Sequence, residues 1–153
     1  MVVIASDNQA SQRDLRREQL LAIAVERFAK FGYHNTKISD IVAQAGVAQG
    51  TFYWYFKSKE SIALEIIESG KERLLQVIRR GYRTGTGTVQ EMVQGSQRLL
   101  CDIFQFAAEN RYFMELLLTG RGEDEAIRQA FANARIEMEE AFKRNIERAI
   151  ELG

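Results

Sequence analysis

The chain contains no proline among its 153 residues. Proline ends or kinks helices, because it lacks a backbone donor and its ring clashes with the preceding turn. Long stretches instead consist of Ala, Leu, Glu, Arg, Gln and Ile, most of which favour the α-helix. Apolar residues recur at spacings of three and four, as they do on one face of a helix. The sequence therefore predicts an all-α protein.

Three short helical patterns occupy the N-terminal part of the chain. Residues 1–12 are polar and without pattern, and we expect them to form a flexible tail. The next segment, 13–58, begins with an apolar stripe at Leu20, Ile23, Ala24, Phe28 and Phe31. Gly32 and Gly46 stand where left-handed caps would end the first and second helices, and Thr36 or Ser39 can cap the start of the second. A third helix is expected at about 49–55.

The remainder of the chain, 59–153, is predicted to be a second helical domain. Ser58 is a suitable N-cap for a long helix that runs to about Arg80. The glycine- and threonine-rich stretch Gly81 to Thr88 is a loop, and helical patterns follow at about 89–108, 110–120 and 123–151. We expect the long helix to join the three-helix N-terminal domain to a helical-bundle C-terminal domain.

Composition excludes several classes of function. The net charge is zero, so no overall field attracts nucleic acid or membrane. One cysteine and one histidine leave no disulfide, no metal cluster and no acid–base or nucleophile constellation for catalysis. We expect no cofactor and no enzymatic activity. No apolar run reaches the length of a membrane span, and a cytoplasmic location is expected.

Two short helices joined by a glycine-containing turn predict a helix-turn-helix motif, whose second helix enters the DNA major groove. That helix begins with Gln49, Gly50 and Thr51, side chains that can reach base edges or allow close approach. Tyr and Lys residues follow in "TFYWYFKSKE", where hydroxyl and ammonium groups can hold phosphates. Phe52 and Phe56 lie four residues apart, and we expect them to face the core.

The segment from Leu21 to Ile62 resembles the TetR family of bacterial transcriptional regulators. Its shared elements are "A…F…GY", "T…DIV..AGV" and "G.FY.YFKSKE". The resemblance implies a phosphate-binding Thr opening helix two, a phosphate-binding Tyr in the recognition helix and a phosphate-binding Lys at the start of helix four. Tyr55 stands where many members have His. The DNA contacts that follow from the resemblance are Thr36, Ser39, Gln49, Gly50, Thr51, Tyr53, Trp54, Tyr55 and Lys59.

The same resemblance implies a repressor that acts as a homodimer on a palindromic operator in double-stranded DNA and is released by a small-molecule effector. The C-terminal half is rich in large apolar residues, which line either an effector pocket or an ordinary bundle core. The candidate ligand-binding residues are Ser96, Leu100, Ile103, Phe104, Phe113, Leu117, Phe131 and Met138. TetR-like proteins usually continue with two more helices, so we expect a truncated or shortened C-terminal domain.

An interaction module is the alternative from another class. Its aromatic cluster, Phe52 to Phe56, would bind a protein or a membrane surface. Thr, Gln and Lys residues among these rings, and the shortness of the helix, favour DNA instead.

Overall fold

The computed structural model describes residues 3–120 and 124–153, and their side chains except those of residues 3–8 and 10. Seven helices and no strand make up this described part, which confirms the all-α prediction. The helices are α1 (Val3–Phe31), α2 (Ile38–Ala45), α3 (Gln49–Tyr55), α4 (Lys59–Arg80), α5 (Val89–Glu109), α6 (Arg111–Thr119) and α7 (Glu125–Leu152).

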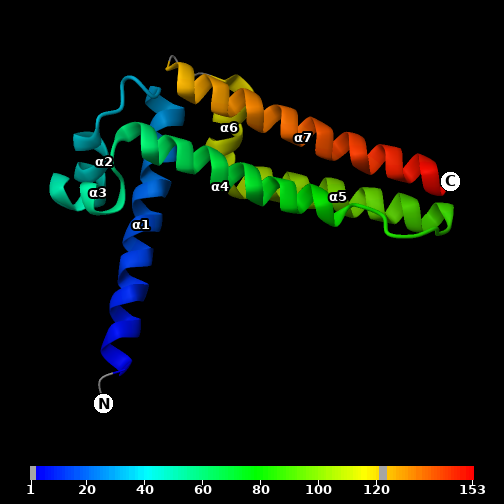
Figure 1. Cartoon of the computed structure of the whole chain (residues 1–153), viewed down its shortest axis with the longest axis horizontal. Coiled ribbons are helices and arrows are strands. Elements are labelled where there is room, and N and C mark those ends of the chain that lie inside the picture. Colours follow the sequence, from blue (N-terminus) through cyan, green and yellow to red (C-terminus); the bar gives the residue numbers. More distant parts are fainter. Residues whose placement is uncertain (1–2, 121–123) are drawn as a thin grey trace.

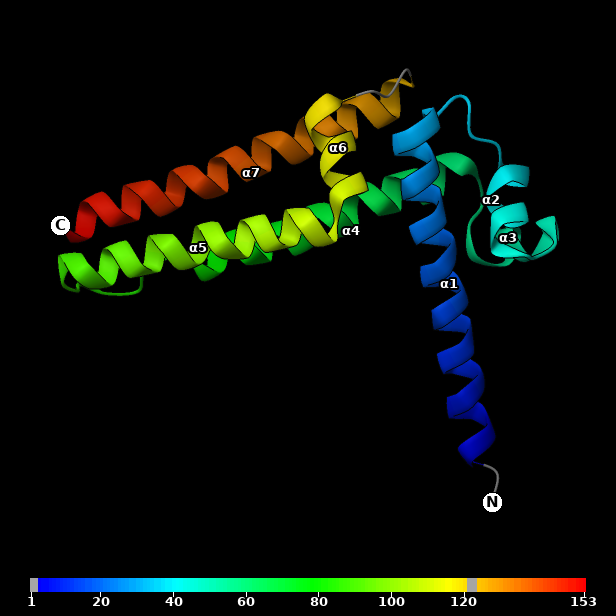
Figure 2. The same cartoon turned by 180° about the vertical axis from the view of Figure 1, so that it is seen from behind.

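The helices form two groups connected by α4. Helices α2 and α3 pack beside the C-terminal half of α1 at one end of the molecule (Figure 1). Helices α4, α5 and α7 extend together away from this group, and the short α6 contacts both α1 and α4 (Figure 2). The N-terminal helix-turn-helix domain is thus joined by a long helix to a helical bundle, as the sequence predicts. None of the described helices is long and apolar enough to span a membrane.

Helix α1 is longer than expected. Residues 3–12 are helical, which corrects the prediction of a patternless tail; residues 1–2 lie outside the described part. No Gly or Pro precedes Gly32, so nothing in the sequence interrupts a helix that has once formed. The predicted apolar stripe is buried at Leu20, Ala24 and Phe28, but its last member, Phe31, is exposed beneath the Arg27 guanidinium.

Glycines end the first two helices in the predicted way. Gly32 has φ 88° and Gly46 has φ 68°, values in the left-handed region that favours glycine. Tyr33 follows directly after Gly32 and packs its ring 5.3 Å from that of Phe28, the apolar contact that accompanies such caps. The start of α2 differs from the prediction. Lys37 holds the N-cap position, and its backbone N–H donates to Asp40 Oδ2 at 2.8 Å.

Helix α4 begins with the predicted cap. The Ser58 hydroxyl accepts from Ser61 N at 3.0 Å, and the Ser61 hydroxyl accepts in turn from Ser58 N. Further along, Lys71 is nearly buried and its ammonium lies 2.9 Å from Glu68 and 3.1 Å from Glu137 of α7. These partners, Glu68 first, raise the pKa of Lys71, so the ammonium stays charged where α4 meets α7.

A close approach holds α6 against α4. A Cβ atom at Gly70 would lie 2.2 Å from the Phe113 ring, so this ring fits only because residue 70 has no side chain. Phe113 is buried and its ring packs edge-on against Phe106 of α5. Gly70 therefore sets the distance at which α6 can pack against α4.

We predict that Gly70→Ala lowers the free energy of unfolding by about 1–3 kcal/mol, because the added methyl group overpacks the α4–α6 contact. Gly95→Ala on α5 is the matched control, since a Cβ atom there meets nothing within 4 Å. Alanine at this helical position should stabilise the protein by about 0.5–1 kcal/mol. Urea denaturation of both variants checks the pair, and equal effects would contradict the packing argument.

Candidate DNA-binding interface

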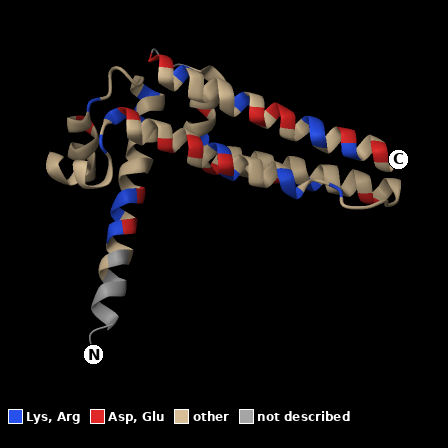
Figure 3. Cartoon of the chain, viewed as in Figure 1, with Lys and Arg blue, Asp and Glu red and all other residues tan. Residues whose placement is uncertain are grey.

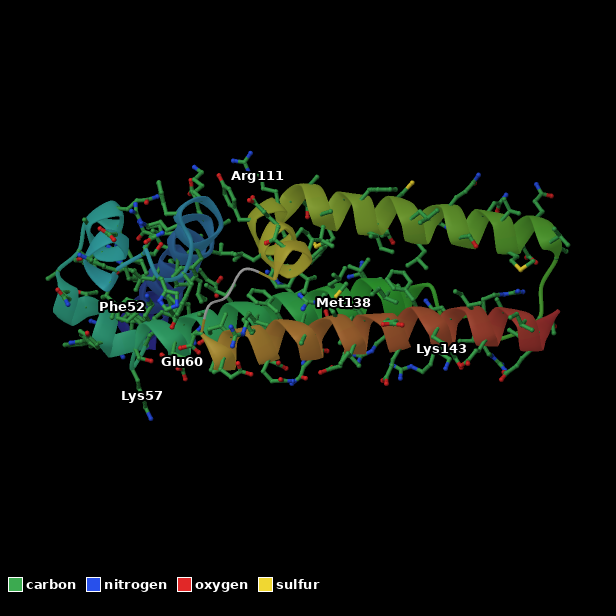
Figure 4. All side chains as sticks on the ribbon, turned by 90° about the horizontal axis from the view of Figure 1, so that it is seen from above. Phe52, Lys57, Glu60, Arg111, Met138 and Lys143 are labelled. Atoms are coloured by element: carbon green, nitrogen blue, oxygen red, sulfur yellow. The ribbon has the colours of Figure 1, made fainter. Side chains whose placement is uncertain are left out.

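The seven residues of α3 divide into a buried side and an exposed side. Phe52 is 0% exposed and Phe56, which follows the helix, is also buried. Their ring centroids lie 5.6 Å apart, and the Arg17 guanidinium of α1 covers the Phe56 ring at 5.0 Å. In Figure 4 Phe52 lies inside the N-terminal domain, whereas Lys57 points away from it. The prediction that both Phe residues face the core is confirmed.

The opposite side of α3 presents neutral polar and aromatic groups to solvent. Gln49 and Gly50 are exposed, Thr51 is half-buried, Tyr53 is 52% exposed and Trp54 is 84% exposed. Helix α3 itself carries no charged residue (Figure 3). Such a surface can donate and accept hydrogen bonds and offer apolar contact, which is the chemistry needed to read base edges.

Two further residues of the predicted interface, Tyr55 and Ser39, differ in their exposure. Tyr55 is half-buried, and its ring packs against the core beside Phe56, so only part of the ring faces outward. Ser39 in the first turn of α2 is exposed. The structure therefore brings an accessible set of Ser39, Gln49, Gly50, Thr51, Tyr53 and Trp54 to the surface of α2 and α3.

Lys59 performs a task that the sequence did not predict. Its ammonium donates to the Tyr33 carbonyl at 2.8 Å and lies 4.2 Å above the Tyr33 ring. Burial lowers the pKa of Lys59, and Asp124 opposes this shift. The ammonium is thus directed inward, where it ties the start of α4 to the turn after α1. A phosphate contact by this side chain would require it to leave the Tyr33 carbonyl.

Thr36 is likewise committed to the fold. Its side chain is 0% exposed, and its hydroxyl donates to the Gly32 carbonyl at 2.9 Å. The expected phosphate contact by the Thr36 side chain is therefore corrected, because a buried hydroxyl cannot reach a duplex. Its physical role is to close the turn between α1 and α2.

Tyr33 is the residue that reasoning from the sequence missed. Burial raises the pKa of its hydroxyl, with further contributions from Asp124 and Glu60. The signal was present, since an apolar residue directly after a C-cap glycine commonly packs back onto the last turn of the helix. Tyr33 and Lys59 together fix the orientation of α4 relative to α1.

The eight candidate ligand-binding residues do not meet in one cavity. Phe113, Leu117 and Phe131 are buried in the core, and Ile103 and Met138 pack against it. Ser96, Leu100 and Phe104 are exposed. Leu100 and Phe104 lie on a side of α5 that turns away from α4, because their spacing of four residues places them together and outside the buried stripe.

Comparison with known proteins identifies relatives of the N-terminal domain. Residues 20–66, which hold the α2–α3 pair and the start of α4, match the model for bacterial regulatory proteins of the tetR family. This segment of the chain is therefore similar to the DNA-binding domain of tetR-family regulators. Over 62 residues it is 47% identical to the fatty acid metabolism regulator protein of Bacillus subtilis (strain 168), a match that covers 40% of this chain and 30% of that protein.

Two solved structures resemble this chain over both groups of helices. A transcriptional regulator from Aquifex aeolicus VF5 has the same fold, with a TM-score of 0.69, 23% identity, and coverage of 86% of this chain and 71% of the other. The fatty acid degradation regulator FadR from Bacillus halodurans has a TM-score of 0.61 and 27% identity, with coverage of 78% and 60%. The matched proteins are all named as regulators.

We predict that Thr36→Val lowers the free energy of unfolding by about 1 kcal/mol, because the Gly32 carbonyl loses a buried hydrogen bond while the side-chain shape is kept. Chemical denaturation measures this change. Ser39→Ala is the control, and its exposed position should keep the effect within about 0.5 kcal/mol. Unchanged stability in Thr36→Val would contradict the structural role of this hydroxyl.

Proposed function

We propose that this chain is a sequence-specific DNA-binding transcriptional regulator that reads its operator with α3. The observation that carries the proposal is the division of α3, in which the buried Phe52 holds the helix while Gln49, Tyr53 and Trp54 face outward. The match of residues 20–66 to the tetR-family model and the regulators among the relatives support the same function.

The exposed residues of α3 have distinct chemical tasks in this proposal. Gln49 can pair with adenine through two hydrogen bonds, and Thr51 can touch the methyl group of thymine. Gly50 allows the backbone to approach the groove closely. The Tyr53 hydroxyl donates to a phosphate oxygen, and the Trp54 ring lies against sugar or base methyl groups. Ser39 of α2 adds a contact at the edge of the groove.

The regulator acts as a homodimer on a palindromic operator. One α3 offers too few base contacts for a specific site, and two half-sites lie about 34 Å apart along the duplex. Exposed apolar side chains of the bundle support self-association. These are Val89, Val93, Leu100 and Phe104 on one side of α5, and Ile136, Ile146 and Ile150 on α7.

A small-molecule effector releases the repressor from its operator. Ligand bound to the helical bundle shifts α4, and this shift changes the separation of the two recognition helices. The fixed contact between Lys59 and the Tyr33 carbonyl supports this route, since α4 cannot tilt without moving the end of α1. The relatives named for fatty acid metabolism and degradation support a role in lipid-linked regulation.

We predict that Tyr53→Phe weakens binding to all duplexes by about tenfold, because a phosphate contact is lost, whereas Gln49→Ala changes the preferred bases. Bound sequences selected from a pool of random duplexes, followed by anisotropy titrations, distinguish the two effects. Tyr82→Phe is the matched control, since Tyr82 is exposed in the loop far from α3. Unaltered affinity and preference in both α3 variants would exclude this recognition surface.

We predict that Phe104→Asp shifts the protein from dimer to monomer at micromolar concentration, because a buried carboxylate opposes apolar association. Sedimentation equilibrium measures the change. Gln105→Asp adds the same charge to another exposed side of α5 and should leave the dimer intact. A monomeric wild-type protein, or a dimeric Phe104→Asp variant, would rule out this interface.

A further inference from the structure

The first half of α1 leaves the body of the molecule. In two opposite views it projects beyond α2, α3 and the helical bundle (Figure 1, Figure 2). Every side chain from Ser11 to Leu15 is exposed, whereas Leu20 is 0% exposed in the core of the N-terminal domain. The helix that precedes Arg16 begins at Val3 and is therefore about 20 Å long. This projection lies outside the tetR-family match, which begins at residue 20.

The charged side chains of the projection sort into a basic side and an acidic side. Arg13 and Arg16 lie three residues apart, and Asp14 and Glu18 lie four apart, so each pair shares one face of the helix. The two faces point in different directions, because neighbouring residues of a helix are rotated by about 100°. Both signs of charge are marked on this part of α1 in Figure 3. The charges are thus separated around the helix and are not mixed.

Contacts of the next helical turn show which way the basic side faces. Arg17, four residues after Arg13, covers the Phe56 ring at 5.0 Å and forms an ion pair with α4. Phe56 follows directly after α3, so Arg17 marks the side of α1 that faces this helix. Leu20, four residues after Arg16, is buried in the same core. Arg13 and Arg16 therefore continue the inward side of α1 beyond the edge of the N-terminal domain.

The charges of Arg13 and Arg16 are available to a partner. Within the described residues neither forms an ion pair, and Arg16 donates to the neutral Gln19 Oε1 at 2.6 Å. Arg17 differs, because the Glu65 carboxylate pairs with it. Arg13 is exposed and Arg16 is half-buried. A guanidinium group at the surface is suited to phosphate, which it can hold through two parallel hydrogen bonds.

The remaining side chains favour a nucleic-acid backbone over a lipid surface. A helix that lies on a membrane opposes its polar face with a broad apolar face. In this chain Leu15 is the sole large apolar residue between Ser11 and Gln19. It lies three residues before Glu18, on the acidic side of the helix. The projection therefore has a basic face without the apolar face that a membrane requires.

We propose that the projecting half of α1 is a second contact surface for double-stranded DNA, on which Arg13 and Arg16 hold phosphate groups of the duplex that α3 reads. The inference rests on the proposed regulator function, since it requires α3 to lie in the groove. The contact is made to the backbone, so it adds affinity without adding base preference. A helical segment that packs against nothing in its own chain is marginal in water, and a bound duplex would stabilise it.

Anisotropy titrations of the full chain at several salt concentrations test the proposal. One duplex carries a sequence selected from a random pool, and a second has the same length and an unrelated sequence. The double variant Arg13→Gln, Arg16→Gln should reduce the slope of log K against log salt by about 2 for each bound protomer, because two phosphate contacts are lost. Its affinity should fall by about tenfold or more on both duplexes, while the preferred bases stay the same.

Matched variants separate position from charge. Arg80→Gln combined with Arg144→Gln removes the same two charges from exposed positions of the bundle and should leave slope and affinity at wild-type values. Arg13→Lys combined with Arg16→Lys keeps the charges and should keep the slope. Thermal melting verifies that each variant is folded. Equal changes in the two glutamine pairs, or no change in either, would overturn the proposal.

A lipid surface is the competing partner for the two arginines. Vesicles of phosphatidylglycerol and phosphatidylcholine are sedimented with the wild type and with the Arg13→Gln, Arg16→Gln variant. We expect both proteins to stay in the supernatant to the same extent. Vesicle binding that depends on these arginines, together with unchanged duplex binding, would assign the projection to a membrane and overturn the proposal.

The two readouts separate this inference from the proposed function. Base preference reports on α3, and the salt slope reports on Arg13 and Arg16. If a sequence is selected but the slope is the same in the double variant, the second contact surface fails and the regulator remains. If duplexes bind through the two arginines without base preference, the contact surface remains and sequence-specific regulation fails.

Discussion

Burial of Phe52 is the contact on which the recognition surface depends. A helix of seven residues is too short to be stable by itself in water and needs packing to hold it. Full burial of a Phe side chain contributes about 1.5–3 kcal/mol, and Phe56 adds a second ring to the same side. Because these rings point inward, the intervening Tyr53 and Trp54 must point outward. The same packing thus stabilises the short helix and creates the surface that we assign to DNA.

A single rigid element links the two ends of the molecule. Helix α4 has 22 residues and is therefore about 33 Å long. Its N-terminus is fixed by the Ser58 cap and the bond from Lys59 to the Tyr33 carbonyl, and its C-terminus by Asn145 of α7. A displacement at the C-terminal end of α4 can therefore reach the helix-turn-helix domain through one helix. The close contact between Gly70 and the Phe113 ring limits how far α4 can move relative to α6.

Reasoning from the sequence was most successful where a local rule decides the structure. The absence of proline, the apolar spacing, Gly32, Gly46 and the Ser58 cap sufficed for an all-α helix-turn-helix architecture. The division of α3 followed from the spacing of Phe52 and Phe56. These features depend on residues close together in the chain, and the sequence displays them directly.

The sequence was least informative where contacts between residues distant in the chain decide the structure. The family resemblance implied phosphate contacts for Thr36 and Lys59, whereas the structure shows the Thr36 hydroxyl closing a turn and the Lys59 ammonium bonded to the Tyr33 carbonyl. Leu100 and Phe104 were candidates for an effector pocket because they are apolar. The packing of α5 on α4 leaves both side chains exposed to solvent.

Trp54 provides the most direct measurement of the central claim, that the outward side of α3 contacts DNA. It is the sole tryptophan of the chain and is 84% exposed, so its fluorescence reports on this surface alone. Acrylamide should quench it efficiently in the free protein, and much less in the presence of a saturating amount of a selected duplex. Equal quenching with and without bound duplex would show that DNA does not cover α3 and would contradict the account.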